Sequence, residues 1–172
     1  IPSRKNNTNT DNLTRHVYKY YTKNFKEYSW NDRGSDERNY CSPGIDLPMC
    51  TIMRSKFGDY KEYHTSDDNL IKVVNKKGLN DSFDLISKLH FSADNFCYPK
   101  VKFMGEPFLT KRNLYPHIGA DKLPKKIMLI KNILTYSDGS NSVIDIANKC
   151  KTPVWEIISI INELKKKKLL YV

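Results

Sequence analysis

Apolar residues recur every three or four positions in the last third of the chain, which is the spacing of one face of an α-helix. Three stretches show this spacing, at 125–136, 143–150 and 154–164. The third follows Thr152-Pro153, an N-cap residue and a proline that suits the first helical position. A short apolar run, 169–172, then predicts a strand. Three helices followed by a strand predict a winged-helix module.

The first half of the chain mixes two periodicities. Residues 11–24 begin with an Asx cap and continue as an amphipathic helix. Residues 25–30 alternate in polarity, and 47–53 form an apolar run typical of a buried strand, with a loop at 35–43 between them. A further amphipathic helix is predicted over 77–91. Helix, strand, loop, strand and helix in this order predict an α/β domain.

The two patterns meet in a stretch without helical periodicity. Prolines and a glycine are spread between 98 and 116. We therefore divide the chain into an α/β domain over 1–97, a linker with any connecting strand over 98–120, and a winged-helix domain over 121–172. No apolar run approaches the roughly 20 residues of a membrane helix, so we expect no membrane contact.

The four cysteines point to a reducing compartment. They are widely spaced along the chain and form no Cys-x-x-Cys pair. This pattern fits neither a disulfide framework nor a structural zinc site. Residues 1–20 are polar and basic, without the apolar centre of a signal peptide. We expect reduced thiols and a cytoplasmic protein.

Positive charge is concentrated toward the end of the chain. The net charge is +10, and residues 111–172 contribute 12 basic and 5 acidic residues. A basic module can bind nucleic acid or an acidic partner. The plainer interpretation is that the chain comes from a lysine-rich proteome. Lys165, Lys166, Lys167 and Lys168 form the candidate nucleic-acid site. The exposed face of the third helix is not basic enough for phosphate contacts, so we favour a packing or protein-interaction role.

The candidate chemistry lies between residues 35 and 69. Three motifs follow one another there: Ser35-Asp36-Glu37-Arg38, Pro43-Gly44-Ile45 and Tyr63-His64-Thr65-Ser66-Asp67-Asp68. They resemble the last part of the site of two-zinc aminopeptidases of the bacterial leucyl-aminopeptidase type. In that family a Ser-Asp-His or similar element and a strand precede a His-Thr-x-x-Asp turn, whose His is the last metal ligand. The resemblance implies that His64 is a zinc ligand.

Further segments extend the resemblance over nearly the whole chain. They read CSPGIDLP at 41–48, MRSKFG at 53–58, GEP at 105–107 and KRNLYP at 111–116. They are similar to a bacterial family with an aminopeptidase-like domain and a C-terminal winged helix, often named for polysaccharide biosynthesis. The resemblance implies the back half of a three-layer α/β/α sandwich followed by a small winged-helix domain. It also implies a peptide or another amide-containing substrate, including an acylated sugar derivative.

Five other residues are candidates for contacting the substrate or supporting the metal ligand. Asp36, Glu37 and Arg38 form the first motif, and Glu37 stands where many relatives have His. Glu37 could contact a ligand amine, pair with Arg38 or Arg54, or simply be solvated. Arg54 could bind a substrate carboxylate or form a surface ion pair. Asp68 could orient the site, but we favour a helix N-cap.

The resemblance also implies ligands that this chain lacks. The family brings a first His, a bridging Asp and a Glu-Glu pair from sequence before the His-Thr turn. Here the only other His before His64 is His16, and no Glu-Glu pair occurs. We expect a C-terminal fragment or truncated form of a zinc-dependent hydrolase that is inactive alone, and zinc binding by this chain is doubtful. The alternative is a winged-helix nucleic-acid-binding or adaptor protein.

Overall fold

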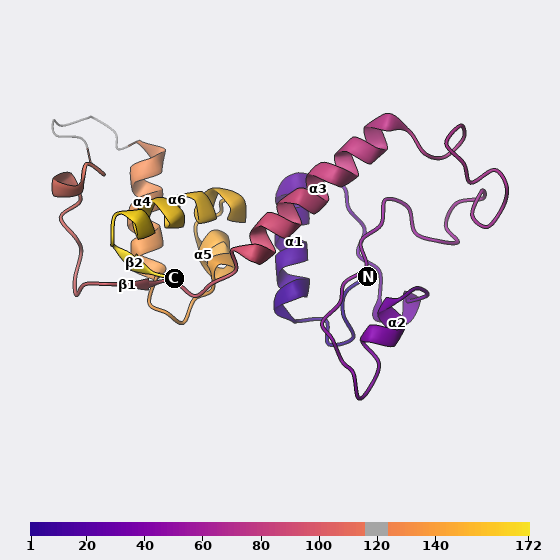
Figure 1. The fold of residues 1–172 in the computed structure, drawn as a ribbon, viewed down its shortest axis with the longest axis horizontal. Helices are drawn as coiled ribbons and strands as arrows, with labels where there is room; N and C mark the ends of the chain where they lie inside the picture. Colours follow the sequence, from indigo (N-terminus) through magenta and orange to yellow (C-terminus); the bar gives the residue numbers. More distant parts are fainter. Residues whose placement is uncertain (116–123) are drawn as a thin grey trace. The chain divides into compact units, whose positions relative to one another are not determined.

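The structure, a computed structural model, describes residues 1–115 and 124–172 (Figure 1). The chain divides into two compact units, Ile1–Ala93 and Asp94–Val172. The elements are α1 (Asn9–Tyr21), η1 (Trp30–Asp32), α2 (Glu37–Tyr40), α3 (Lys76–Asp94), β1 (Lys100–Val101), η2 (Leu109–Arg112), α4 (Lys125–Tyr136), α5 (Val143–Lys149), α6 (Val154–Lys166) and β2 (Leu170–Tyr171).

Helix α1 begins with a reciprocal cap. The Thr8 hydroxyl accepts a hydrogen bond from the Asp11 amide at 3.3 Å, and Asp11 Oδ2 accepts one from the Thr8 amide at 2.9 Å. This capping box satisfies two donors that the first turn of a helix leaves open. Leu13 and Val17 turn inward and are buried. The helix predicted over 11–24 is confirmed, with its start shifted to the Thr8 cap.

The two strands predicted in the first unit are not formed. Residues 25–29 and 47–53 are irregular chain, Trp30 belongs to η1, and no strand occurs among the described residues of this unit. A strand exists only with a neighbour that completes its hydrogen-bond ladder. Here the pairing is limited to Ile1 and Thr51, whose backbones exchange two hydrogen bonds. The first unit is therefore helical and irregular, and the described residues do not form the expected three-layer sandwich.

Helix α3 confirms the helix predicted over 77–91 but lacks the expected covering. Its start is capped by Asn75, whose side chain accepts from the Gly78 amide at 2.8 Å. Only Gly78 and Ser92 of the helix are buried. Its apolar side chains at Leu79, Phe83 and Ile86 are 57%, 75% and 41% exposed. The helix thus presents apolar surface that the described chain does not cover.

The second unit has the predicted winged-helix architecture. Helices α4, α5 and α6 match the three predicted helices, and β2 lies within the predicted strand. Strand β2 pairs antiparallel with β1, so that Lys100 faces Tyr171 and Val101 faces Leu170. Strand β1 falls in the stretch assigned to the linker. The boundary predicted between 120 and 121 lies outside the described residues.

The turn between α5 and α6 differs in one detail from the prediction. Pro153, not Thr152, is the N-cap residue of α6, and it makes no side-chain cap. The Thr152 hydroxyl instead donates to the Cys150 carbonyl at 3.0 Å. Helix α5 is capped through Ser142 and Asp145, in the same reciprocal manner as α1. The core of the unit is apolar and includes Ile133, Ile146 and Leu164.

Candidate functional site

His64 lies at the tip of an exposed turn in the first unit. Its backbone is in the left-handed region with φ of 59°, and its ring stacks on Tyr63 with a centroid distance of 3.9 Å. The Thr65 hydroxyl donates to the Glu62 carbonyl at 2.7 Å and fixes the turn from inside. The His64 side chain is exposed. An exposed imidazole on a hydrogen-bonded turn can offer a nitrogen to a metal ion.

One imidazole does not make a metal site. Zinc in proteins is held by three or four side chains of His, Cys, Asp or Glu. Within residues 1–115 and 124–172 there is no group of three or more such side chains placed to share an ion. His64 therefore fits one arm of a zinc site, and the described residues do not fit a complete one.

Asp68 belongs to the same turn but does not cap a helix. Its carboxylate accepts a hydrogen bond from the Tyr60 hydroxyl at 2.8 Å. The residues after it form turns rather than the predicted helix start, and Asn69 takes the capping role there. Asn69 Oδ1 accepts from the amides of Ile71 and Lys72 at 2.9 and 3.1 Å. The predicted Asp68 cap is therefore wrong, because its acceptor oxygens face Tyr60 and the helix begins later.

Glu37 is a buried structural acceptor. Its carboxylate accepts hydrogen bonds from the amides of Gly34 and Ser35 at 2.8 and 3.1 Å, and from the Thr51 hydroxyl at 2.8 Å. Burial raises the pKa of Glu37, but these hydrogen bonds outweigh it and hold the pKa below its ordinary value. Glu37 thereby ties the start of α2 to the segment around Thr51. It is neither solvated nor paired with an arginine in the described chain.

The other predicted site residues lie apart from one another. Asp36 and Arg38 flank Glu37 and are exposed. Arg54 Nη1 lies 3.7 Å from Asp81 Oδ2 of α3, and both side chains are partly exposed. Arg54 thus takes the surface ion pair that was the alternative to substrate binding. Of the six predicted site residues in this unit, only Arg54 lines the large cleft described next.

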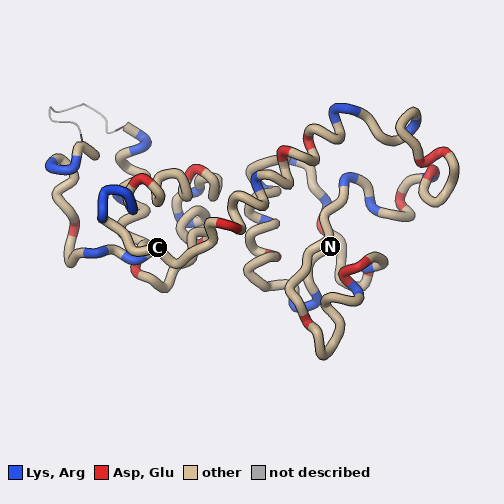
Figure 2. Tube along the Cα trace, in the orientation of Figure 1, with Lys and Arg blue, Asp and Glu red and all other residues tan. Residues whose placement is uncertain are grey.

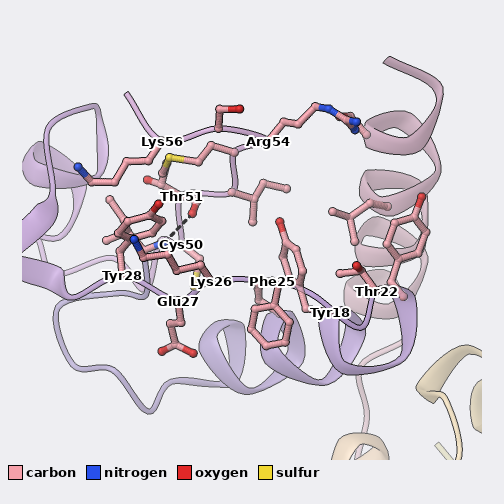
Figure 3. Close-up of a pocket in the computed structure, with 18 of the residues that line it drawn as sticks. Tyr18, Thr22, Phe25, Lys26, Glu27, Tyr28, Cys50, Thr51, Arg54 and Lys56 are labelled. Carbon is pink, nitrogen blue, oxygen red and sulfur yellow. Dashed lines mark hydrogen bonds between the residues drawn. The ribbon is translucent and has the colours of Figure 1, made fainter. Parts of the chain in front are cut away.

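A cleft of about 1150 Å³ opens in the first unit. Figure 3 shows the segment with Thr51, Arg54 and Lys56 on one side of it and the segment Phe25–Tyr28 on another. Residues of α1, the first half of α3 and the N-terminal pair Ile1-Pro2 complete its lining. Residues 25–28 lie within the strand predicted over 25–30, and Thr51 lies within the strand predicted over 47–53.

A buried carboxylate anchors one end of the cleft. Asp11 accepts hydrogen bonds from the amide and hydroxyl of Ser3 at 2.7 and 2.6 Å, and Cys50 Sγ donates to it at 2.9 Å. Burial raises the pKa of Asp11, but the bonds from Cys50, Ser3 and Thr8 lower it to about 2. Burial, with the adjacent carboxylate, raises the pKa of Cys50 to about 12. Cys50 is thus a neutral thiol donor rather than a reactive thiolate.

The candidate nucleic-acid site lies at the end of α6 in the second unit. Lys165, Lys166 and Lys168 are exposed, and Figure 2 shows this stretch as a continuous basic segment. Lys167 is tied down, because its ammonium donates to the Arg112 carbonyl at 2.9 Å. Glu163 on α6 pairs with a lysine of α4 at 2.7 Å. The basic charge is therefore local to one end of the helix.

Two family models together cover nearly the whole chain. Residues 1–95 match the family described as "Domain of unknown function (DUF4910)". Residues 97–172 match a winged helix-turn-helix family. The second match agrees with the three helices and two-stranded sheet of the second unit.

A curated relative and a solved structure, both from Clostridium acetobutylicum, are similar to this chain. One, named as a polysaccharide biosynthesis protein with an aminopeptidase-like domain, is 40% identical over 132 residues, which are 76% of this chain and 29% of the relative. The other is a crystal structure described as that of a peptidase. It matches 99% of this chain and 37% of its own, with a TM-score of 0.84 and 29% identity. The chain thus spans about a third of the length of the proteins that it matches.

Proposed function

This chain belongs to the family described as "Domain of unknown function (DUF4910)", with a winged helix after it, and we propose that it forms the C-terminal portion of a zinc-dependent aminopeptidase-like hydrolase. The observation that carries the proposal is the match of 99% of this chain, with a TM-score of 0.84, to a structure described as a peptidase. The name of the curated relative supports the aminopeptidase-like part. A fold alone would not decide the chemistry.

His64 is the residue through which this portion would serve the reaction. We assign it one coordination position of a zinc ion whose other ligands lie outside this chain. Its exposed ring and its hydrogen-bonded turn support the assignment. That this chain is inactive alone is part of the same proposal. Glu37 would then stabilise the loop around it, and Asp68 the turn that carries His64. The exposed residues Asp36, Arg38 and Arg54 would be the ones to contact the substrate.

The substrate class follows from the resemblance rather than from a pocket of this chain. We propose a peptide or another amide-containing molecule, and the relative's name makes an acylated sugar derivative a reasonable member of that class. The four cysteines are free thiols, in keeping with a cytoplasmic location. No helix in the described parts of the chain is long and apolar enough to cross a membrane.

Zinc binding by a chimaera tests the proposal. In it, this chain replaces the matching region of the Clostridium relative, so that all ligands are present. We expect stoichiometric zinc in the chimaera, a loss of affinity of more than about 100-fold in His64→Ala, and no change in the control His90→Ala, whose side chain is also exposed. The 172-residue chain alone should bind no stoichiometric zinc. If His64→Ala left the zinc affinity of the chimaera unchanged, the assignment of His64 as a zinc ligand would be refuted.

The winged helix is proposed as a protein-interaction domain, with nucleic-acid binding as the alternative. The exposed lysines at the C-terminal end of α6 favour the alternative, and the acidic residues on α6 oppose it. Binding to duplex DNA decides between them. If the alternative holds, affinity at low salt falls steeply with salt concentration and is lost when Lys165, Lys166 and Lys168 are changed to Gln. An absence of binding at low salt would leave the protein-interaction role.

A further inference from the structure

Two walls of the cleft carry backbone groups without hydrogen-bond partners. In residues 1–115 and 124–172, the amides and carbonyls of 25–28 make no hydrogen bond, and neither do those of Ile52 and Met53. Residues 25–27 are exposed, and 28, 52 and 53 are half-buried, so these groups are open to solvent and free to pair with a neighbouring strand. Both segments lie along the same cleft. The cleft is therefore bordered by two segments able to accept a strand.

The pair formed by Ile1 and Thr51 gives the direction of that strand. The nitrogen of Ile1 donates to the Thr51 carbonyl at 2.9 Å, and the Thr51 amide donates back to the Ile1 carbonyl at 3.0 Å. Two residues that exchange both bonds form the hydrogen-bonded pair of an antiparallel ladder. The next such pair on this side of the segment involves Met53. Its amide and carbonyl thus face the side on which Ile1 lies.

Side chains around the cleft are also suited to a polypeptide. Phe25 and Ile86 line it and are 42% and 41% exposed. The volume of about 1150 Å³ exceeds the roughly 300–1000 Å³ of a usual small-molecule pocket. An extended segment would use the open backbone groups for affinity and these apolar side chains for specificity.

We infer that the cleft receives an extended polypeptide segment that adds as a β-strand, antiparallel to residues 51–53 and with residues 25–28 along its other edge. The occupant is the part of the aminopeptidase-like polypeptide that this chain does not span. The inference rests on the proposed function for that occupant, because this chain covers 29% of the curated relative and 37% of the solved chain that it matches. It goes beyond that function in naming the surface on which the missing part docks.

Amide hydrogen exchange of the same chimaera, beside the 172-residue chain, tests the inference. In the chain alone, the amides of Met53 and residues 26–28 should exchange at rates close to those of unstructured peptide. In the chimaera, Met53 and those amides of residues 26–28 that face the added strand should exchange at least about 100-fold more slowly, since each of these gains a ladder bond and such amides alternate along a strand. The amides within α1 report whether the first unit is folded in both samples.

A matched pair of variants isolates the backbone bond. Met53→Pro removes the amide that would pair, whereas Met53→Ala removes only the side chain and keeps it. Protection of residues 26–28 in the chimaera should fall at least about 10-fold in Met53→Pro and stay in Met53→Ala, with α1 protected in both. Equal protection in the two variants would overturn the antiparallel pairing at Met53.

The remaining outcomes separate this inference from the proposed function. If the amides that border the cleft are protected in the chimaera but His64→Ala leaves zinc affinity unchanged, the proposed role of His64 is refuted and the docking surface stands. Zinc held through His64 while Met53 and residues 26–28 exchange freely would overturn the docking surface alone. Protection in the 172-residue chain by itself, with the mass of a dimer, would show that a second copy fills the cleft and would also overturn it.

Discussion

The two units of this chain bury apolar side chains very differently. Among the described residues, nineteen buried apolar side chains lie in the second unit and three, Leu13, Val17 and Cys41, lie in the first. The first unit buries carboxylates instead, at Asp11 and Glu37, and leaves apolar residues of α3 exposed. Burial of apolar surface is the main source of stability in folded domains. The second unit is therefore stabilised by an apolar core of its own residues, whereas the first depends on hydrogen bonds to buried carboxylates.

Each unit contains one tryptophan, so the difference can be measured in the intact chain. Trp30 lies in the first unit and Trp155 in the second. In the variant Trp155→Phe the fluorescence reports the first unit, and in Trp30→Phe it reports the second. The predictions below use these two reporter backgrounds in urea.

The largest effect is expected from emptying the core of the second unit. Leu164 on α6 is fully buried. Leu164→Ala should destabilise this unit by about 2–5 kcal/mol, because it removes buried methyl groups and leaves a cavity. The Trp155 transition should move to lower urea, and the Trp30 transition should stay. The control Ile71→Ala, at a side chain that is 93% exposed, should leave both transitions in place. A shift of both transitions in Leu164→Ala would contradict two separate cores.

In the first unit the largest effect should come from a polar residue. Asp11→Asn weakens the acceptor that joins Ser3, Thr8 and Cys50, and should cost about 1.5–3 kcal/mol in the Trp30 transition. The surface carboxylate Asp84, paired with Lys88 at 2.6 Å, is the control. Asp84→Asn should cost no more than about 0.5 kcal/mol. Equal effects of the two substitutions would show that the Asp11 contacts do not stabilise the unit.

Acid should weaken the first unit through the same carboxylate. The pKa of Asp11 is about 2 in the folded chain and about 3.9 in an unfolded one. Because the folded value is the lower one, this stabilisation is complete above about pH 5 and is lost as the pH falls toward 2, by up to about 2 kcal/mol. The lowered pKa of Glu37 acts in the same direction. Asp11→Asn should flatten the pH dependence of the Trp30 transition, and an unchanged slope would be evidence against the Asp11 contribution.

The smallest expected effects form a matched pair of helix caps. Thr8 caps α1 in the first unit and Ser142 caps α5 in the second, each in a reciprocal box with an aspartate. Thr8→Ala and Ser142→Ala should each cost about 1 kcal/mol. Each substitution should be seen only by the tryptophan of its own unit. A response of both tryptophans to either substitution would indicate that the units unfold together.

The second unit was predictable from sequence because its stability is local to its own residues. Apolar spacing at 125–136 and 154–164 reflects faces that meet within the unit, so the pattern and the packing agree. Strand β1 was not identified because two residues carry no periodic signal. It is recognised only through its pairing with β2.

The first unit was less predictable because its pattern of apolar and polar residues fits contacts that the described residues do not make. Residues 25–30 and 47–53 have the polarity of strands but no ladder partners beyond the pair of Ile1 and Thr51. The same holds for the site. The motif identified His64 and its turn, while the structural role of Glu37 depends on amides and a hydroxyl brought to it by folding. Sequence spacing cannot show such convergence.

The most direct test of this account is urea unfolding of the two single-tryptophan variants, each measured in the 172-residue chain and in the chimaera. We predict that in the chain the Trp155 transition lies at clearly higher urea than the Trp30 transition. In the chimaera the Trp30 transition should rise toward it, since the missing polypeptide then covers the first unit. Coincident transitions in the chain alone, with no change of the Trp30 midpoint in the chimaera, would contradict the claim that the first unit is completed by the rest of a longer protein.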